Sequence, residues 1–286
     1  MVIFKTVADI QAYIAKQKAE KKKIGFVPTM GALHKGHISL VEKAKQDGAF
    51  VVASIFINPT QFNDKEDFDK YPVTTGQDIL MLTEAGCDVL LLPSVAEMYP
   101  EGSANMQSYN FGYLETMLEG AHRPGHFKGV GQIVARLLDI VKPDAMYMGQ
   151  KDYQQCMVVT NLLSQLYREQ APEMVICPTT REQDGLAMSS RNRRLTEPQR
   201  ALAGRLYQCL VSIQAKQSDK FSIVQKECND LLMEKGFDPD YIALADANNL
   251  TLLEEYEPNR KMVALIAAKL GNVRLIDNMI INPDSN

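Results

Sequence analysis

The sequence predicts a chain of the α/β class, with a parallel-sheet domain first and a smaller α+β domain second. Up to about residue 178, short segments rich in β-branched residues alternate with helix-like segments, which is typical of βα units around a parallel sheet. Beyond that point the alternation stops, and no internal repeat or low-complexity segment is present. We therefore expect a Rossmann-like domain at residues 1–178 and a smaller α+β domain at residues 179–286.

The elements of the first domain follow from the spacing of its apolar residues. Residues 1–23 predict an amphipathic helix, because Val7, Ile10 and Ile14 recur on one helical face and lysines follow them. The predicted strands are residues 24–28, 50–57, 89–92, 145–148 and 174–177. The helices predicted between them lie near residues 36–48, 74–86, 128–141 and 152–167.

The second domain begins with two predicted helices. The first starts at Thr196 and carries Leu202, Leu206, Leu210 and Ile213. The second carries Ile223, Val224, Leu231 and Leu232 and ends at Gly236. Residues 241–244, 262–268 and 273–276 then predict strands, which makes this part α+β.

Charge and hydropathy exclude two classes of partner. The formal net charge is −4 and the sequence pI is about 5.7, so the chain lacks the basic surface that binds nucleic acid. An export signal would place its charge before an apolar run, whereas here the lysines come after it. No uncharged apolar run approaches the roughly 18 residues of a membrane helix. We expect a soluble protein with no nucleic-acid or membrane partner.

The five cysteines predict a reducing compartment. They are scattered, odd in number and free of any C-x-x-C pair, which is unlike a disulfide framework or a zinc site. We therefore expect reduced thiols, a cytoplasmic location and no resident metal.

The segment from Pro28 to His37 reads P-T-M-G-A-L-H-K-G-H and lies where the first central strand ends and a helix begins. Ligands bind at this carboxyl edge of a parallel sheet, and free backbone N–H groups at a helix start favour a phosphate. Two imidazoles three residues apart, His34 and His37, can donate to phosphate oxygens and stabilise charge as pyrophosphate leaves. The alternative is a pair of structural histidines. The H-x-G-H pattern resembles the signature of the nucleotidyltransferase and class I aminoacyl-tRNA synthetase superfamily.

Two further motifs follow. After the next strand, Asn58 and Gln61 in F-I-N-P-T-Q-F present amides that can bind hydroxyl and carboxylate groups, although a proline-terminated strand and turn would look the same. In the Gly- and Pro-rich run of residues 122–130, Arg123 can pair with an anion. A surface loop with satisfied charges is the alternative there.

The last two motifs contain positively charged side chains. In G-Q-K-D, Lys151 can neutralise phosphate, and Asp152 can hold Mg²⁺ or a ribose hydroxyl or serve as a helix N-cap. In M-S-S-R-N, two hydroxyls and Arg191 open the second domain. This segment can close over a triphosphate, as the K-M-S-K-S loop does in class I synthetases, or be an interdomain linker.

Taken together and in this order, the five motifs resemble the pantoate-β-alanine ligase family. The resemblance is strong over about residues 24–195 and weak beyond. It implies that pantoate and ATP, with Mg²⁺, give pantoyl-adenylate and pyrophosphate, and that the β-alanine amine then gives pantothenate and AMP. ATP is thus a substrate, and the family suggests a homodimer.

The resemblance also implies roles for individual residues. His34, His37, Lys151 and Arg191 would be catalytic, with His37 usually taken as proton donor, although carboxylate attack on phosphorus needs charge stabilisation and no proton. Gln61 and Gln155 would bind substrate, with Asn58, Arg123 and His126 as further candidates. The implied ATP-binding residues are Met30, Gly31, Ala32, Leu33, His34, Lys35, Gly36, His37, Gly149, Gln150, Lys151, Asp152, Thr180, Met188, Ser189, Ser190 and Arg191.

The chain departs from the family pattern at two positions, and three rival functions are open. Val73 stands where the family commonly has arginine, and Thr180 where it has valine. Another adenylyl or cytidylyl transferase would need no β-alanine, and a silent nucleotide-binding protein would show no turnover. An aminoacyl-tRNA synthetase is disfavoured because no basic tRNA-binding extension is present.

Overall fold

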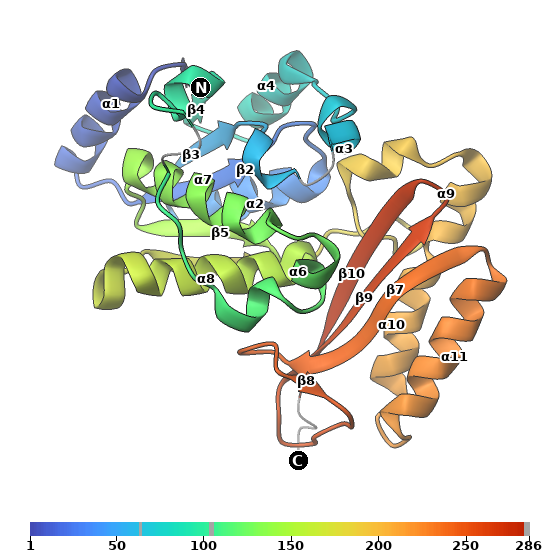
Figure 1. Cartoon of the computed structure of the whole chain (residues 1–286). Coiled ribbons are helices and arrows are strands. Elements are labelled where there is room, and N and C mark those ends of the chain that lie inside the picture. Colours follow the sequence, from blue (N-terminus) through green and yellow to red (C-terminus); the bar gives the residue numbers. More distant parts are fainter. Residues whose placement is uncertain (63–64, 103–105, 283–286) are drawn as a thin grey trace. The chain divides into compact units, whose positions relative to one another are not determined.

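The computed structural model describes residues 1–62, 65–102 and 106–282 (Figure 1). The chain divides into two compact units. The first comprises Met1–Gly149 and Val158–Pro178, and the second comprises Gln150–Met157 and the chain from Thr179 onward. The sequence-based division into domains at residue 178 stays a prediction.

The first unit is built on a parallel sheet of six strands in the order β1-β4-β3-β2-β5-β6. The strands are β1 (Val2–Phe4), β2 (Ile24–Thr29), β3 (Phe50–Ile55), β4 (Val89–Leu91), β5 (Ala145–Gly149) and β6 (Glu173–Cys177). All their pairings are parallel. From β2 the chain steps outward to β3 and β4 and then returns to the other side of β2 with β5, so the strand order reverses between β2 and β5. In open parallel sheets, ligands bind at the carboxyl ends of the strands at such a reversal.

Helices surround this sheet (Figure 1). The longer ones are α1 (Val7–Ala19), α2 (Lys35–Gln46), α4 (Thr75–Glu84), α7 (His126–Val141) and α8 (Tyr153–Tyr167). Short elements of this unit are α3 (Lys65–Asp69), α5 (Val95–Met98), α6 (Glu119–His122), η1 (Pro59–Gln61), η3 (Gly112–Glu115) and η5 (Arg168–Gln170). The turn η4 (Gln150–Asp152), just before α8, belongs to the second unit. Helix α2 packs on β2, β3 and β5, and its Leu40, Val41 and Ala44 join the core under Val27 and Val51.

The N-terminal prediction is wrong for residues 1–6. In place of a continuous helix, Val2–Phe4 forms the edge strand β1, paired in parallel with Val89–Leu91. β-Branched and aromatic residues favour a pleated strand, and Thr6 then caps α1 by accepting a hydrogen bond from the Asp9 N–H. Helix α1 also ends at Ala19, before the lysine run.

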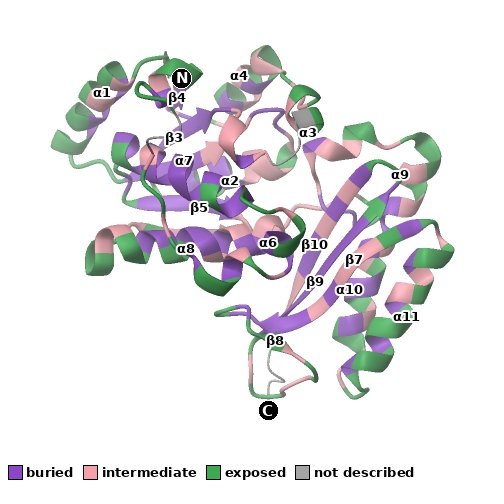
Figure 2. Ribbon diagram, viewed as in Figure 1, coloured by how far each residue is buried: buried purple, intermediate pink, exposed green. Residues whose placement is uncertain are grey.

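The second unit holds an antiparallel sheet of four strands in the order β10-β9-β7-β8. Its elements are η6 (Ser190–Arg194), α9 (Glu197–Ala203), α10 (Arg205–Ala215), α11 (Phe221–Glu234), β7 (Phe237–Asp246), β8 (Leu252–Leu253), β9 (Met262–Leu270) and β10 (Val273–Ile281). Helix α10 packs on β9 and β10, and α11 packs on β7 (Figure 1). Figure 2 shows the buried residues concentrated on the strands and on one side of these helices. The predicted succession of a parallel α/β part and an α+β part is confirmed.

Two predictions for the second unit need correction. The single helix predicted from Thr196 is two helices, α9 and α10, which meet at Gly204. A side chain at Gly204 would press on Asp184, because an added Cβ would lie 3.0 Å from its carbonyl oxygen. Strands β7 and β10 also run further than predicted. In β10, the polar residues Asp277 and Asn278 continue the ladder opposite Ile266 and Leu265, and β7 already pairs with β9 from Phe237, opposite Leu270.

None of the helices in the described residues is long and apolar enough to span a bilayer.

All five cysteines are buried and unpaired. Burial raises the pKa of Cys87 to about 11 and that of Cys177 to about 11. The thiolate is the reactive form. These two thiols are therefore unreactive both because they are buried and because they stay protonated.

We expect a dithiobis(nitrobenzoate) reagent at about pH 8 to label none of the thiols of the native protein within minutes, because all five are buried and the reagent cannot reach them. The raised pKa of Cys87 and of Cys177 also keeps those two thiols protonated. The same reagent should label all five after denaturation in guanidinium chloride. Rapid labelling of the native protein would show that the cysteine environments are wrong.

Candidate active site

The loop between β2 and α2 takes an unusual backbone path. Gly31 has φ +83 and Ala32 has φ +49, so two successive residues adopt the left-handed region that disfavours side chains. An added Cβ at Gly31 would lie 3.1 Å from Asp78 and 3.1 Å from Ile55, so only glycine fits there. The path turns the chain sharply from the end of β2 into the start of α2.

Asp78, in the first turn of α4, holds this loop. Its Oδ2 accepts from the Ala32 N–H at 3.0 Å, and its Oδ1 accepts from the Leu33 N–H at 2.9 Å. The Thr74 hydroxyl donates to Oδ1 at 3.0 Å. The carboxylate is 1% exposed, so these bonds form away from competing water and are charge-assisted. Sequence reasoning missed Asp78, since nothing local in the helix links it to a loop 45 residues away.

The two histidines form a reciprocal cap at the start of α2. The Nδ1 of His34, the N-cap residue, accepts from the Gly36 N–H at 3.2 Å. The Nδ1 of His37 accepts from the His34 N–H at 3.3 Å, and the ring centroids are 4.1 Å apart. A neutral ring whose Nδ1 accepts carries its proton on Nε2. Both rings are therefore fixed as Nε2–H donors at the positive end of a helix.

The loop after β3 meets the first one, because Thr29 at the end of β2 is paired with Ile55 at the end of β3. In this loop the Gln61 Nε2 donates to the Met30 Sδ at 2.8 Å. Gln61 therefore touches the predicted ATP-binding segment directly. It is 8% exposed.

Asn58 is 1% exposed and is bound on all sides by protein groups. Its Nδ2 donates to the Gln61 Oε1 at 3.2 Å and to the Gly129 carbonyl at 3.3 Å. Its Oδ1 accepts from the Tyr99 hydroxyl, whose pKa is raised by burial. The amide is thus placed to orient Gln61, and direct substrate binding by Asn58 stays a prediction.

Arg123 and His126 support the same loop from the start of α7. The Arg123 Nη1 lies 3.1 Å from the His126 Nε2, and the His126 Nδ1 lies 2.7 Å from the Gln61 carbonyl oxygen. Arginine can only donate, so Nε2 accepts and the protonated Nδ1 donates to that carbonyl. His126 is 5% exposed and holds the main chain of Gln61.

In the second unit, residues Gln150–Asp152 of the G-Q-K-D segment form the turn η4. The Lys151 Nζ lies 3.1 Å from the Asp152 Oδ1, and the Gln150 Nε2 donates to the Asn278 Oδ1 at 3.1 Å. Asp152 precedes α8, and Gln155 lies in its first turn, half-buried. Among the described residues, no group of three or more His, Cys, Asp or Glu side chains is placed to hold a metal ion.

The M-S-S-R-N segment follows a hairpin. The Met188 N–H donates to the Thr180 carbonyl at 3.0 Å, so the residue that departs from the family pattern uses its backbone here. Ser189 caps η6, with its Oγ accepting from the Arg191 N–H at 3.2 Å, and Ser190 is buried.

The predicted site residues therefore divide between the two units. In the first unit, one chain of contacts joins Met30, Gln61, Asn58, His126 and Arg123, and the histidine pair follows Met30 at the start of α2. Gly149 also belongs to this unit. The second unit carries Gln150–Asp152, Gln155, Thr180 and Met188–Arg191.

Comparison with known proteins covers nearly the whole chain. Residues 2–280 match the family described as pantoate-beta-alanine ligase. The pantothenate synthetase of Cytophaga hutchinsonii is 42% identical over 98% of this chain and 99% of its own length. That of Pseudomonas fluorescens (strain Pf0-1) is 46% identical over 98% of each chain.

Two solved structures are similar as well. The pantothenate synthetase of Thermus thermophilus has a TM-score of 0.90 and 40% identity, covering 99% of this chain and 100% of the other. The pantoate-beta-alanine ligase of Francisella tularensis, complexed with beta-gamma ATP and beta-alanine, has a TM-score of 0.80 and 36% identity. The coverage there is 98% of this chain and 97% of the other.

We expect Asp78→Ala to lower the free energy of unfolding by about 2 to 4 kcal/mol, because it removes a charged acceptor and leaves buried N–H groups unpaired. Denaturant titration measures the change. Glu84→Ala, at an exposed position on the same helix, should stay within about 0.5 kcal/mol of the unsubstituted protein. Equal stability of the two variants would contradict the role of Asp78.

Proposed function

The chain belongs to the pantoate-beta-alanine ligase family, and we propose that it performs the family's reaction with the loops that follow β2, β3 and β5. It condenses pantoate with β-alanine to pantothenate at the expense of ATP. The histidine cap carries the proposal, because it fixes two imidazole donors at the carboxyl edge of the sheet, beside the strand reversal where ligands bind.

The reaction proceeds in two displacements. A pantoate carboxylate oxygen attacks the α-phosphorus of ATP, and the bond to the pyrophosphate oxygen breaks, which leaves pantoyl-adenylate. The β-alanine amine then attacks the acyl carbon, loses a proton and expels AMP. A free carboxylate resists amines, whereas the acyl phosphate anhydride carries a good leaving group, so the chain needs no covalent nucleophile.

His34 and His37 stabilise the charge that develops on the phosphates. With both Nδ1 atoms accepting from backbone N–H groups, the proton of each neutral ring sits on Nε2, where it can be donated to an oxygen. Preorganised donors of this kind need no reorganisation at the moment of reaction. The arrangement supports hydrogen bonding rather than proton transfer by His37, since the attack on phosphorus consumes no proton.

The pantoate site lies around Gln61. The contact of Gln61 with Met30, in the loop proposed to bind ATP, supports this assignment. Asn58 binds the side chain of Gln61, and His126 binds its main chain. We assign the hydroxyl and carboxylate contacts of pantoate to Gln61, with Gln155 as the second amide. Arg123 acts through His126, to which it is bonded.

The second unit supplies cations for the phosphates. Lys151, Ser189, Ser190 and Arg191 contact the triphosphate, and Thr180 contributes a backbone contact to the adenine. Mg²⁺ bound to the phosphates would neutralise their charge, and it requires only one or two protein carboxylates. Asp152, whose side chain is 45% exposed, fits that need.

The remaining assignments follow from the family and the thiols. Five buried, unpaired cysteines suit a reducing compartment such as the cytoplasm. The net charge of −4 gives no reason to expect nucleic acid as a partner. A homodimer is proposed on the resemblance alone.

With pantoate, β-alanine, Mg²⁺ and ATP, we expect pantothenate and AMP to form together, as followed by a coupled AMP assay. His37→Ala and Lys151→Ala should each lower kcat by about 100-fold or more, because each removes a donor to the reacting phosphates. Lys226→Ala, at an exposed position on α11, should leave kcat unchanged. ADP as product, or AMP formation indifferent to pantoate, would refute the function.

Pantoate labelled with ¹⁸O in its carboxylate should transfer one labelled oxygen to AMP, because the attacking oxygen stays on phosphorus when the amine expels AMP. Mass spectrometry of the AMP measures this. Label found in pyrophosphate, or in neither product, would exclude the acyl-adenylate.

A further inference from the structure

Strand β10 carries two adjacent polar residues in an otherwise buried setting. Asp277 is 4% exposed and Asn278 is 2% exposed. Polar groups so deeply buried destabilise a fold unless they are hydrogen-bonded. We propose that Asn278 is a positioning residue that fixes the main chain of Lys151, and that the Arg181–Asp277 ion pair holds Asn278 in place; this rests on the phosphate role proposed for Lys151.

Both polar atoms of the Asn278 amide bind the segment Gln150–Lys151. Its Nδ2 donates to the Gln150 carbonyl at 2.9 Å and to the Lys151 carbonyl at 2.9 Å. Its Oδ1 accepts from the Gln150 Nε2 at 3.1 Å. Two successive carbonyls held by one amide define the orientation of the peptide between them. The direction in which the Lys151 side chain leaves the main chain is therefore set by a residue 127 positions away.

The Arg181–Asp277 pair fixes Asn278 from the other side. The Arg181 Nη1 donates to the Asp277 Oδ2 at 2.6 Å, and Nη2 donates to Oδ1 at 3.1 Å. Asp277 Oδ1 also accepts from the Asn278 N–H at 2.8 Å. A two-point guanidinium pair has little freedom to rotate, so it anchors the backbone from which the Asn278 amide projects.

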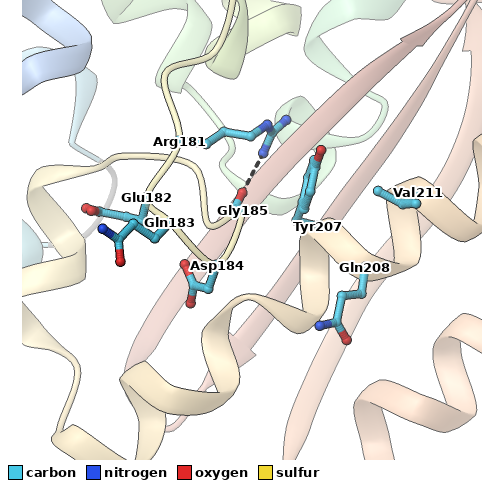
Figure 3. Close-up of a pocket in the computed structure, with 8 residues that line it drawn as sticks. All are labelled: Arg181, Glu182, Gln183, Asp184, Gly185, Tyr207, Gln208 and Val211. Carbon is cyan, nitrogen blue, oxygen red and sulfur yellow. Dashed lines mark hydrogen bonds between the residues drawn. The ribbon is translucent and has the colours of Figure 1, made fainter.

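The same guanidinium reaches the hairpin that leads to the M-S-S-R-N segment. Arg181 donates to the Gly185 carbonyl at 3.0 Å and lies over the Tyr207 ring at 4.3 Å (Figure 3). Gly185 has φ +87, and an added Cβ would lie 2.0 Å from the Tyr207 ring, so the hairpin packs tightly there. One polar network within the second unit thus links the backbone of Lys151 to the hairpin preceding Ser189 and Arg191.

The network gives the second unit a fixed spacing between its two phosphate-binding segments. Neither segment lies in a long helix or strand. The first is the single turn η4, and the second is the short helix η6, which Ser189 caps. Their geometry therefore depends on side chains that bind the main chain. Misplacing a reacting group by about 1 Å is enough to cost on the order of 100-fold in rate.

A double-mutant cycle tests the proposal on the full-length chain. Asn278→Ala should lower kcat/KM for ATP by on the order of 10- to 100-fold, with native thermal unfolding as the check on folding. In a Lys151→Ala background the same substitution should cost less than about twofold, because a residue that acts through Lys151 has nothing left to position. Arg181→Lys keeps the positive charge but loses the two-point pairing with Asp277. It should lower kcat/KM by a smaller factor than Asn278→Ala does.

Asn229→Ala, at a partly exposed position on α11, is the matched control and should behave as the unsubstituted protein. If Asn278→Ala does not fold, Asn278→Ser takes its place in the cycle, since a hydroxyl can still donate to one carbonyl. If the double variant loses kcat/KM by the product of the two single losses, the positioning role is overturned. It is also overturned if Asn278→Ala alone leaves kcat/KM unchanged. An unchanged Lys151→Ala variant would instead refute the phosphate role proposed for Lys151.

Discussion

The buried carboxylate of Asp78 is the constraint on which the loop between β2 and α2 depends, and this loop carries the residues proposed to bind ATP. Ala32 occupies a left-handed conformation that costs a non-glycine residue about 1 to 2 kcal/mol. Asp78 accepts hydrogen bonds from the backbone N–H groups of Ala32 and Leu33. These charge-assisted bonds offset that cost. With the loop held, His34 arrives at the N-cap position of α2, and the two imidazoles cap each other.

The same device recurs in two other segments that carry proposed site residues. Loop backbones cannot satisfy their own carbonyl and N–H groups, so buried polar side chains do it for them. His126 binds the carbonyl of Gln61, and Asn278 binds the carbonyls of Gln150 and Lys151. Through these bonds, they decide where the proposed ligand-binding side chains point.

The grouping of the cations has a structural origin. Helix α8 begins among residues of the second unit and ends among residues of the first. Lys151, just before it, therefore belongs to the unit that also carries Arg191. The two proposed phosphate-binding cations share one compact unit, whereas the histidine pair belongs to the other.

The sequence by itself determined the parallel α/β part and the α+β part, and it pointed to the loops proposed to hold the site, because hydrophobic period and motif are local signals. It failed for Val2–Phe4, where pairing with the distant strand β4 decides the state. It also failed for the full length of β10, where the polar residues Asp277 and Asn278 continue the pairing with the adjacent strand β9. Only the tertiary structure decided that Asp78 and Asn278 bind the main chain of segments that carry proposed site residues. Their hydrogen bonds to Leu33 and Lys151 join residues separated by 45 and 127 positions along the chain, and no local pattern encodes a contact that exists only after the sheet has assembled.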